Sequence, residues 1–336
     1  MTEHPAITPE PRAGSAADST LISPESPAAG SAPPARHPVA PLLPALRTAI
    51  AVGYPGWADV DLIPLPDSGL AHHHVRLGGT GALARIPKQS QLQLSARANL
   101  DHQAACFERV SESGHAPRLL GIIAPRAGLD RGALLVEFIE GRAAVVPDDL
   151  GAIMTALARI HALPVPEVRA PLGDAADPLA ALADEVAVQA GYLDAAAPGP
   201  RTRGLIDAEL AAVGRLVLRP DRPAKRLITF DAHPGNFVIR ADGSAIIVDL
   251  EKCRYSYPAL DLAHATLYTS TTWEPGATVA LTPAGVADAL DVWARESAVD
   301  GMPPADLAWQ TPLRRLMWLW SVTWCAKWRV LSGSAV

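Results

Sequence analysis

The sequence predicts an α+β fold made of two lobes, and two observations support this prediction. Over residues 41–140, short apolar runs separated by turn signals surround one amphipathic helical segment, which is typical of a helix on an antiparallel sheet. After Gly141 the apolar residues recur every three or four positions, as they do along helices, and one predicted β-hairpin interrupts this pattern. A chain of 336 residues is long enough for both lobes.

The elements of the first lobe follow a tail at residues 1–40, which is rich in Pro, Ala and Ser and predicted to be disordered. In chain order we expect a helix at 42–52, strands at 60–66, 72–77 and 82–86, a helix at 95–111, and strands at 119–123 and 134–139. Leu100, Gln103, Ala104, Phe107 and Val110 share one face of the helix at 95–111. This face is therefore expected to pack on the sheet.

The second lobe, residues 141–336, is predicted to be mostly helical. Asp148 or Asp149 is placed to begin a helix in which Leu150, Ile153, Leu157 and Ile160 form one apolar stripe. Further helices are expected at 178–193, 204–217, 284–297, 305–310 and 312–330. Short strands at 228–230, 237–240 and 245–248 interrupt them.

The composition excludes several classes of protein. Hydrophobic residues make up 49% of the chain and charged residues 19%, which excludes disorder along its whole length. A net charge of −6 argues against binding to nucleic acids or anionic membranes. Charges interrupt the apolar runs before the ~20 residues that a membrane span needs, and no signal-peptide pattern is present. Cys106, Cys253 and Cys325 are too far apart for a metal or disulfide pattern, so we expect a cytoplasmic protein.

The hairpin brings three oxygen-bearing side chains together. Asp242-Gly243 between two apolar runs is a strong hairpin signal, and a two-residue turn there places Asn236 opposite Asp249. A three-residue turn would shift this register by one residue. Asp231 lies five residues before Asn236, in a loop that contains Pro234 and Gly235. Hard oxygen ligands of this kind suit Mg²⁺, which is commonly held by one or two side chains and substrate phosphates.

These residues resemble the signature of the aminoglycoside phosphotransferase and choline kinase superfamily. The signature is Asp231-Ala-His-Pro-Gly-Asn236 followed, thirteen residues after Asn236, by Asp249-Leu-Glu251. Weaker pieces follow the family's order at residues 82–87, 135–141, 156–161 and 258–263, and the resemblance covers roughly residues 58–330.

The resemblance implies a protein-kinase-like two-lobe fold that binds ATP between its lobes and phosphorylates a hydroxyl group of a small molecule. It makes Asp231 the catalytic aspartate, and Asn236 and Asp249 the ligands of Mg²⁺. It also implies that Arg85 contacts the nucleotide phosphates, with Lys88 as a second candidate. The remaining nucleotide contacts that it implies are Ser68 and Gly69 in the phosphate loop, and Glu137, Phe138 and Ile139 in the hinge.

Two departures from the family pattern keep a second hypothesis open. The family has His-Gly before the catalytic aspartate, where this chain has Thr229-Phe230. It also has a glutamate on the helix of the first lobe, where the inward face here offers Gln103. A catalytically inactive relative that binds a nucleotide or a partner protein is therefore an alternative. A manganese-dependent hydrolase is a minor one, since Asp231-Ala-His233 resembles part of its metal box but Gly235 replaces the second aspartate.

Four other features are interpreted with less specific chemistry. His72, His73 and His74 alternate along a predicted strand, so a half-exposed strand is expected rather than a metal site. His161 is interpreted as a structural polar residue. Trp320, Trp324 and Trp328 share a helix face, which is either packed or an aromatic wall for a cationic substrate. Because residues 170–200 and 284–308 are rich in acids, they predict an acidic wall and a cationic acceptor such as an amino sugar or amino alcohol.

Overall fold

The computed structural model describes residues 37–66, 71–273, 279–299 and 307–332. Most of the predicted tail lies outside these ranges, as does the expected turn at residues 67–69. Residues 37–40 are folded, because Val39 is fully buried and Nε2 of His37 lies 2.9 Å from the carbonyl oxygen of Leu65. The globular region thus includes residues that the composition alone assigns to the tail.

A five-stranded antiparallel sheet forms the first lobe. Its spatial order is β1-β2-β3-β5-β4. The strands are β1 (Leu62–Pro64), β2 (His72–Leu77), β3 (Ala82–Pro87), β4 (Leu119–Ile123) and β5 (Ala133–Glu137). All five lie where the sequence predicts them, although β1 and β5 are shorter than expected.

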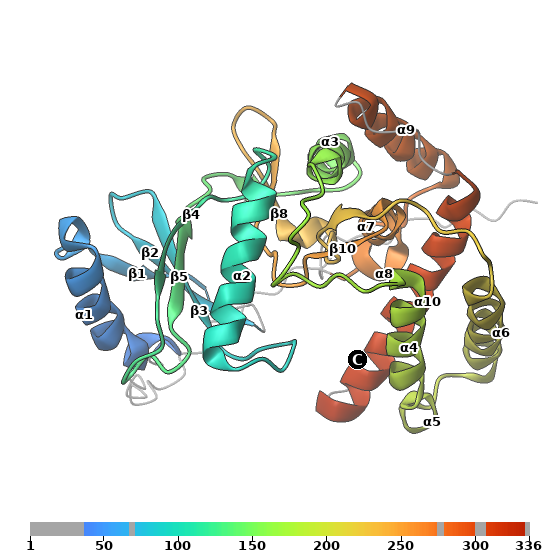
Figure 1. Ribbon diagram of the computed structural model, residues 1–336, viewed down its shortest axis with the longest axis horizontal. Coiled ribbons are helices and arrows are strands. Elements are labelled where there is room, and N and C mark those ends of the chain that lie inside the picture. Colours follow the sequence, from blue (N-terminus) through green and yellow to red (C-terminus); the bar gives the residue numbers. More distant parts are fainter. Residues whose placement is uncertain (1–36, 67–70, 274–278, 300–306, 333–336) are drawn as a thin grey trace, which may run out of the picture. The chain divides into compact units, whose positions relative to one another are not determined.

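Two helices cover opposite faces of this sheet, as Figure 1 shows. They are α1 (Leu43–Gly53) and α2 (Ala96–Ser111). Leu135 of β5 belongs to the core cluster with α1, whereas its neighbours Leu134 and Val136 belong to the cluster with α2. Since both faces are covered, the central strand β5 buries consecutive apolar residues on both sides of the sheet. Ser95 caps α2 by accepting a hydrogen bond from the amide of Ala98, and all of the predicted inward residues of α2 are buried.

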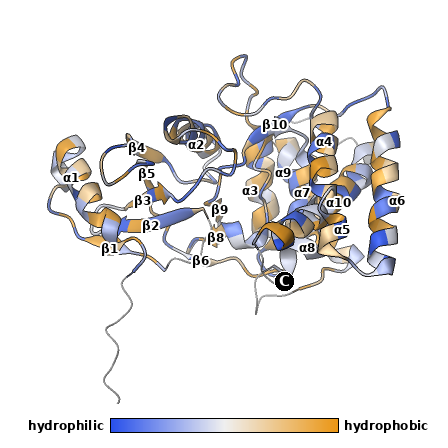
Figure 2. Cartoon of the chain, turned by 90° about the horizontal axis from the view of Figure 1, so that it is seen from below, coloured by the Kyte–Doolittle hydropathy of each residue, from blue (hydrophilic) through white to orange (hydrophobic). Residues whose placement is uncertain are grey.

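The second lobe is helical, as predicted. Its helices are α3 (Leu150–Ala162), α4 (Pro178–Ala190), α5 (Leu193–Ala196), α6 (Pro200–Val217), α7 (Pro258–Thr266), α8 (Tyr268–Thr271), α9 (Pro283–Val299) and α10 (Leu307–Ser332). The hydropathy colouring in Figure 2 shows both strongly hydrophilic and hydrophobic residues along α6, as expected for a half-exposed helix. No helix in the described ranges is both long enough and apolar enough to cross a bilayer.

The expected break between 305–310 and 312–330 is wrong, because α10 is one helix with Pro312 inside it. Proline cannot donate its backbone nitrogen to a helical hydrogen bond, and the cost is lowest near the start of a helix. Pro312 lies in the second turn of α10. Packing of Leu313, Leu316 and Leu319, which are all fully buried, compensates for the lost bond.

The predicted hairpin consists of β8 (Phe237–Ile239) and β9 (Ala245–Ile247), but its two-residue turn is wrong. Phe237 pairs with Ile247, so Asn236 is opposite Val248 and not opposite Asp249. The loop has three residues, 241–243, and ends with Gly243 at φ +83°. A glycine in the left-handed region is what this longer turn requires, so the same Asp-Gly pair is compatible with both registers.

Two further strand pairs hold the hairpin in place. β6 (Arg142–Ala143) pairs with β8, and β7 (Arg226–Ile228) pairs with β10 (Arg254–Ser256). The strand predicted at 228–230 therefore begins two residues earlier, at Arg226, and has the same length.

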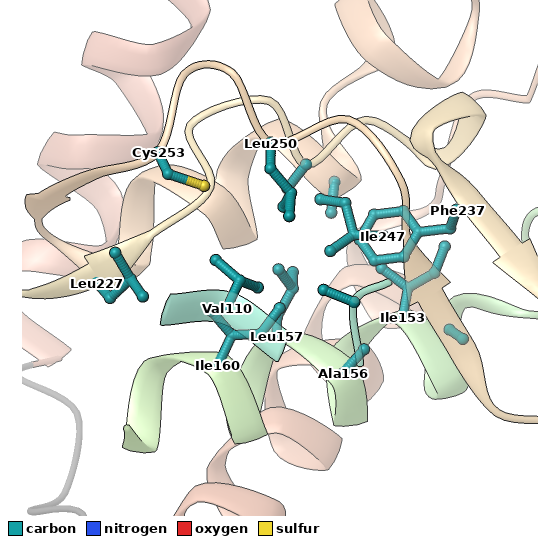
Figure 3. Close-up of a cluster of buried hydrophobic side chains, with 14 of the residues drawn as sticks. Val110, Ile153, Ala156, Leu157, Ile160, Leu227, Phe237, Ile247, Leu250 and Cys253 are labelled. Atoms are coloured by element: carbon teal, nitrogen blue, oxygen red, sulfur yellow. The ribbon is translucent and has the colours of Figure 1, made fainter. Parts of the chain in front are cut away.

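The core beneath the hairpin comes from three elements. Figure 3 shows Phe237 and Ile247 of the hairpin, together with Leu250, lying over Ile153 and Leu157 of α3. Val110 of α2 joins the same cluster, so the first lobe contributes to it. These residues are almost completely buried. Tight packing fixes the end of the hairpin, from which the candidate site residues project.

Candidate active site

A cavity of about 600 Å³ lies between the sheet of the first lobe and the helices of the second. Its described lining includes most of the residues that the sequence singles out. These are Arg85, Glu137, Phe138, Ile139, Asp231, Asn236 and Asp249. Ser68 and Gly69 lie outside the described residues. Lys88 is not among the described lining residues.

Asp231 forms an ion pair with Lys252 in this cavity. Nζ of Lys252 donates to Oδ2 of Asp231 at 2.9 Å, and each side chain is 15% exposed. Burial raises the pKa of Asp231, but the positive charge of Lys252 and the nearby His264 and His233 outweigh it and lower this pKa to about 2. Burial lowers the pKa of Lys252, and Asp231 outweighs that effect and raises it. Both groups are therefore charged at neutral pH.

The backbone before Asp231 is held by Asp261. Phe230 has φ +57°, the left-handed conformation that glycine adopts most easily. One carboxylate oxygen of Asp261 accepts the amide of Thr229 at 2.7 Å, and the other accepts the amide of Phe230 at 2.8 Å. Phe230 thus takes the family's glycine position, and the cost of its conformation is offset by these charge-assisted bonds.

His161 has the structural role that the sequence predicts. It is fully buried, with Nε2 3.2 Å from Asp261 Oδ2, and its Nδ1 accepts a hydrogen bond from Nε1 of Trp293 at 3.0 Å. His161 thus helps to fix the carboxylate of Asp261 that holds the backbone of Thr229 and Phe230.

Asn236 and Asp249 offer oxygen atoms at one end of the hairpin. Nδ2 of Asn236 donates to the carbonyl oxygen of Asp231 at 2.9 Å, which leaves the amide oxygen for another partner. Burial raises the pKa of Asp249, but the charge of Arg85 and the nearby His72 outweigh this effect. The pKa of Asp249 is therefore lowered, and its carboxylate is ionised. A neutral and an ionised oxygen ligand fit Mg²⁺ held partly by phosphates. No cluster of three or more potential His, Cys, Asp or Glu ligands occurs in the described ranges.

Arg85 reaches the same end of the hairpin from the first lobe. Its Nη1 donates to the carbonyl oxygen of Val248 at 2.8 Å, and its Nη2 to Oδ1 of Asp249 at 3.0 Å. Nη2 also lies 3.4 Å from Nδ1 of His72. Nε2 of His72 in turn lies 3.0 Å from Oε1 of Gln103. Gln103 therefore acts on Arg85 through a histidine and not directly.

The burial of His72 corrects the expectation of a half-exposed strand at this position. His72 is 2% exposed because α2 covers this end of β2, whereas His73 and His74 are only partly buried. Burial and the charge of Arg85 lower the pKa of His72 to about 3. The neutral ring then accepts from Arg85 at Nδ1 and donates to Gln103 at Nε2.

The predicted hinge crosses one side of the cavity. The amide of Glu137 donates to the carbonyl of Arg118 at 2.9 Å, and the amide of Phe138 donates to Gly81 at 2.8 Å. The carboxylate of Glu137 pairs with Arg118 and with Arg240. Only part of the hinge backbone is therefore available to a ligand.

Aromatic and hydroxyl side chains line the other end of the cavity. They are His233, His264, Thr269, Ser270, Trp273, Trp320, Ser321 and Trp324. Trp320 is also packed, 5.1 Å from the ring of Phe230, whereas Trp328 is not among the described lining residues. Trp320 therefore packs and also lines the cavity, Trp324 lines it too, and the aromatic wall for a cationic substrate stays a prediction.

The expected acidic wall is absent from the described part of the cavity, so that argument for a cationic acceptor fails. The carboxylates among the described lining residues are Glu137, Asp231 and Asp249. Acidic residues of the two segments form ion pairs elsewhere: Asp174 pairs with Arg169, and Glu296 pairs with Arg159. These acids therefore have structural partners outside the cavity. Asp300 and Asp306 lie outside the described residues.

Lys252, His264 and the hydroxyls of α8 are site residues that the sequence reasoning missed. Lys252 had a detectable signal, because it is a lysine directly after Asp249-Leu-Glu251, the last part of the signature. Thr269 and Ser270 had none, since hydroxyl residues are common in solvent-exposed turns.

Comparisons with known proteins agree with this geometry. The model of the phosphotransferase enzyme family matches residues 64–299. No curated protein matches the chain. Among solved structures, a choline kinase from Streptococcus pneumoniae is 14% identical with a TM-score of 0.59, over 88% of this chain and 93% of that one.

Two further solved structures are similar to this chain. A protein from Ralstonia eutropha assigned to the aminoglycoside phosphotransferases is 12% identical, with a TM-score of 0.63, over 87% of this chain and 91% of that one. An aminoglycoside phosphotransferase from Streptomyces rimosus, in complex with ADP and streptomycin, is 19% identical, with a TM-score of 0.51, over 83% and 98%. The predicted protein-kinase-like fold is confirmed, and the chain belongs to the phosphotransferase enzyme family.

Proposed function

We propose that the protein transfers the γ-phosphoryl group of ATP to a hydroxyl group of a small molecule. The observation that supports this function best is that one cavity holds an ionised aspartate, Asp231, beside two oxygen ligands, Asn236 and Asp249. In this proposal residues 41–140 bind the nucleotide, and residues 141–336 supply the catalytic hairpin and the acceptor site. A cytoplasmic location provides ATP and keeps Cys106 and Cys253 as the free thiols found here.

The nucleotide is assigned to the end of the cavity next to the hinge. The amides of Glu137 and Phe138 are already engaged, so the amide of Ile139 is the hinge donor that we assign to adenine. Arg85 contacts the phosphates with a planar guanidinium that remains charged. Ser68 and Gly69 are proposed to cover the phosphates. The ADP bound to the similar Streptomyces rimosus protein supports a nucleotide in this family.

Asn236 and Asp249 are assigned to Mg²⁺, which neutralises phosphate charge when it is bound. The free amide oxygen of Asn236 and the ionised carboxylate of Asp249 support this assignment. Arg85 holds Asp249 through Nη2, and its Nη1 contact ends at a backbone carbonyl that a phosphate can replace.

Asp231 is assigned to the acceptor hydroxyl. Phosphoryl transfer depends mainly on positioning and charge stabilisation, so a carboxylate that orients the hydroxyl and receives its proton late is sufficient. Lys252 keeps this carboxylate ionised and places a positive charge beside the proposed position of the acceptor hydroxyl.

The inactive-relative hypothesis rests on Gln103 and Thr229-Phe230, and both departures have structural compensation. Gln103 orients His72, which contacts Arg85, and Asp261 holds Phe230 in the conformation of the missing glycine. The manganese-hydrolase alternative is not supported, because the chain belongs to a phosphotransferase family.

Transfer of radiolabelled γ-phosphate from ATP to a panel of sugars, polyols, amino sugars and amino alcohols tests this function. We expect transfer to at least one acceptor that requires Mg²⁺ and is lost in Asp231→Asn. Binding of Mg-ATP with no transfer to any acceptor would instead identify an inactive nucleotide-binding relative.

A further inference from the structure

We propose that the acceptor is an uncharged, polyhydroxylated ring compound of the carbohydrate class. It would bind in an acceptor subsite formed by His264, Thr269, Ser270, Trp273, Trp320 and Trp324. This inference rests on the proposed function, because it names the substrate class of the same cavity. It replaces the cationic acceptor, for which the cavity offers no acidic wall in its described lining.

The first line of evidence is a set of buried polar atoms without a hydrogen-bond partner among the described residues. They are Nδ1 of His233, Nδ1 of His264, Oγ1 of Thr269 and Oγ of Ser270. All four residues line the cavity, and Ser270 and His264 are only 5% and 7% exposed. Native proteins pair nearly all such atoms, so their clustering at one place indicates that a ligand completes them.

The chemistry of these atoms selects for ligand hydroxyl groups. A serine or threonine hydroxyl can both donate and accept, and a neutral imidazole offers one donor and one acceptor nitrogen. Burial lowers the pKa of His264 to about 4, so this ring is neutral at physiological pH. The hydroxyl groups of a sugar can satisfy both kinds of atom. A quaternary ammonium can satisfy neither, because it has no hydrogen-bond donor or acceptor.

The second line of evidence is the aromatic surface beside these atoms. The rings of Trp273 and Trp324 meet edge to face with centroids 5.6 Å apart, and Trp273 is 43% exposed. Nε1 of Trp320 donates to Glu185 at 2.8 Å, which fixes the orientation of that ring. Large, rigid aromatic faces combined with a few polar groups are typical of small-ligand sites. The apolar face of a sugar ring can lie against them.

The third line of evidence is the charge balance, which disfavours a cation. Among the described lining residues, Asp231 is the carboxylate at this end of the cavity, and Lys252 already neutralises it. Nζ of Lys252 lies 5.9 Å from the ring centroid of Trp320. Lys252 therefore occupies the position that a cationic ligand would take over this ring. A second cation there would be repelled by the first.

Binding and transfer measured separately test the proposal. Binding without nucleotide is followed by tryptophan fluorescence and calorimetry, with neutral hexoses and cyclic polyols, the matching amino sugars, and choline as probes. We expect a neutral probe to bind at least ~10-fold more tightly than its amino counterpart, since the positive charge of Lys252 repels a second cation at this end of the cavity. The KM of a neutral acceptor should not change with ionic strength.

Matched variants separate the subsite from the rest of the protein. Trp324→Ala should raise the KM of the neutral acceptor at least ~10-fold and leave the KM of ATP within ~2-fold, since the loss is confined to acceptor binding. Trp328→Ala is the control, because Trp328 stacks on Trp324 at 6.4 Å but does not line the described cavity. Ser270→Ala should reduce the preference for the neutral acceptor.

The outcomes distinguish this inference from the proposed function. Binding of neutral probes without any transfer would support the subsite and contradict the kinase function. Transfer to cationic acceptors only, with a KM that rises with salt, would overturn the subsite and leave the kinase function intact. Failure of every neutral probe to bind would also overturn the subsite.

Discussion

Nζ of Lys252 lies 2.9 Å from Oδ2 of Asp231, so the aspartate assigned to catalysis is paired with a lysine. The lysine comes from the loop after the proposed metal ligand Asp249, and the aspartate comes from the loop after β7. The ion pair thus joins two segments that both have a proposed function. Its consequences, and those of the contacts around it, can be measured.

Asp231→Asn should lower kcat by about 10²–10⁴-fold with little change in the affinity for ATP. The amide keeps the shape of the side chain but cannot accept the proton of the hydroxyl group. Steady-state kinetics and calorimetry with Mg-ATP measure the two effects. Asp101→Asn is the control, because Asp101 is paired with Arg97 on the exposed side of α2. A parallel loss of ATP affinity in Asp231→Asn would instead assign Asp231 to the metal.

Lys252→Met should lower kcat by about 10–10²-fold and destabilise the fold by about 1–3 kcal/mol. The change leaves the carboxylate of Asp231 in a mostly buried position without its cation. Kinetics and urea unfolding measure the two effects. Lys252→Arg should recover most of the stability, and Lys327→Met on α10 is the control. Normal turnover in Lys252→Met would show that the lysine has no part in transfer.

Asp249→Ala should abolish Mg²⁺-dependent binding of ATP while the fold remains intact. The carboxylate supplies the ionised oxygen of the proposed metal pair, and Arg85 keeps its bond to the carbonyl of Val248 when Asp249 is removed, so the loss of stability should not unfold so large a core. Calorimetric titration of ATP with Mg²⁺ and with a chelator gives the metal-dependent part of the affinity. In the wild type this part should be large, and in Asp249→Ala it should vanish. Normal Mg-ATP binding by the variant would remove Asp249 from the metal site.

His72→Ala should raise the KM of ATP about 5–10-fold and change kcat less. His72 links Gln103 to Arg85, so its loss frees the guanidinium that we assign to the phosphates. The neighbouring variant His73→Ala provides the control, because alternate residues of β2 point to opposite faces of the sheet. Gln103→Ala should have the same effect as His72→Ala in a smaller degree. Equal KM values in His72→Ala and His73→Ala would contradict this link.

Asp261→Ala should lower the free energy of unfolding by about 3 kcal/mol or more. The carboxylate is fully buried and accepts the amides of Thr229 and Phe230, so its removal leaves these two donors and Nε2 of His161 without their partner. Urea unfolding followed by circular dichroism measures the change. Asp291→Ala on α9 provides a control outside this network. A loss below about 1 kcal/mol would show that packing alone holds Phe230 in its left-handed conformation.

Local rules predict most of the elements of this protein. The apolar periods place α2, α3 and the strands of the sheet, because the side-chain repeats of helices and strands are properties of the backbone. Spacing along the chain also places Asp231, Asn236 and Asp249 at one end of a hairpin. That conclusion survives the wrong turn, since a shift of one residue leaves Asn236 and Asp249 at the same end.

Contacts between distant residues are what the sequence alone could not predict. The left-handed Phe230 depends on a carboxylate 31 residues away, and the burial of His72 depends on packing by α2. The acids of residues 170–200 suggest a cationic acceptor when only the sequence is considered. The structure shows that arginine and lysine side chains pair with such acids, as Arg169 and Lys225 do with Asp174. The unpartnered hydroxyls of Thr269 and Ser270 are recognised only when their surroundings are known. Charge and hydrogen bonding are set by neighbours in space, and the order of residues does not name those neighbours.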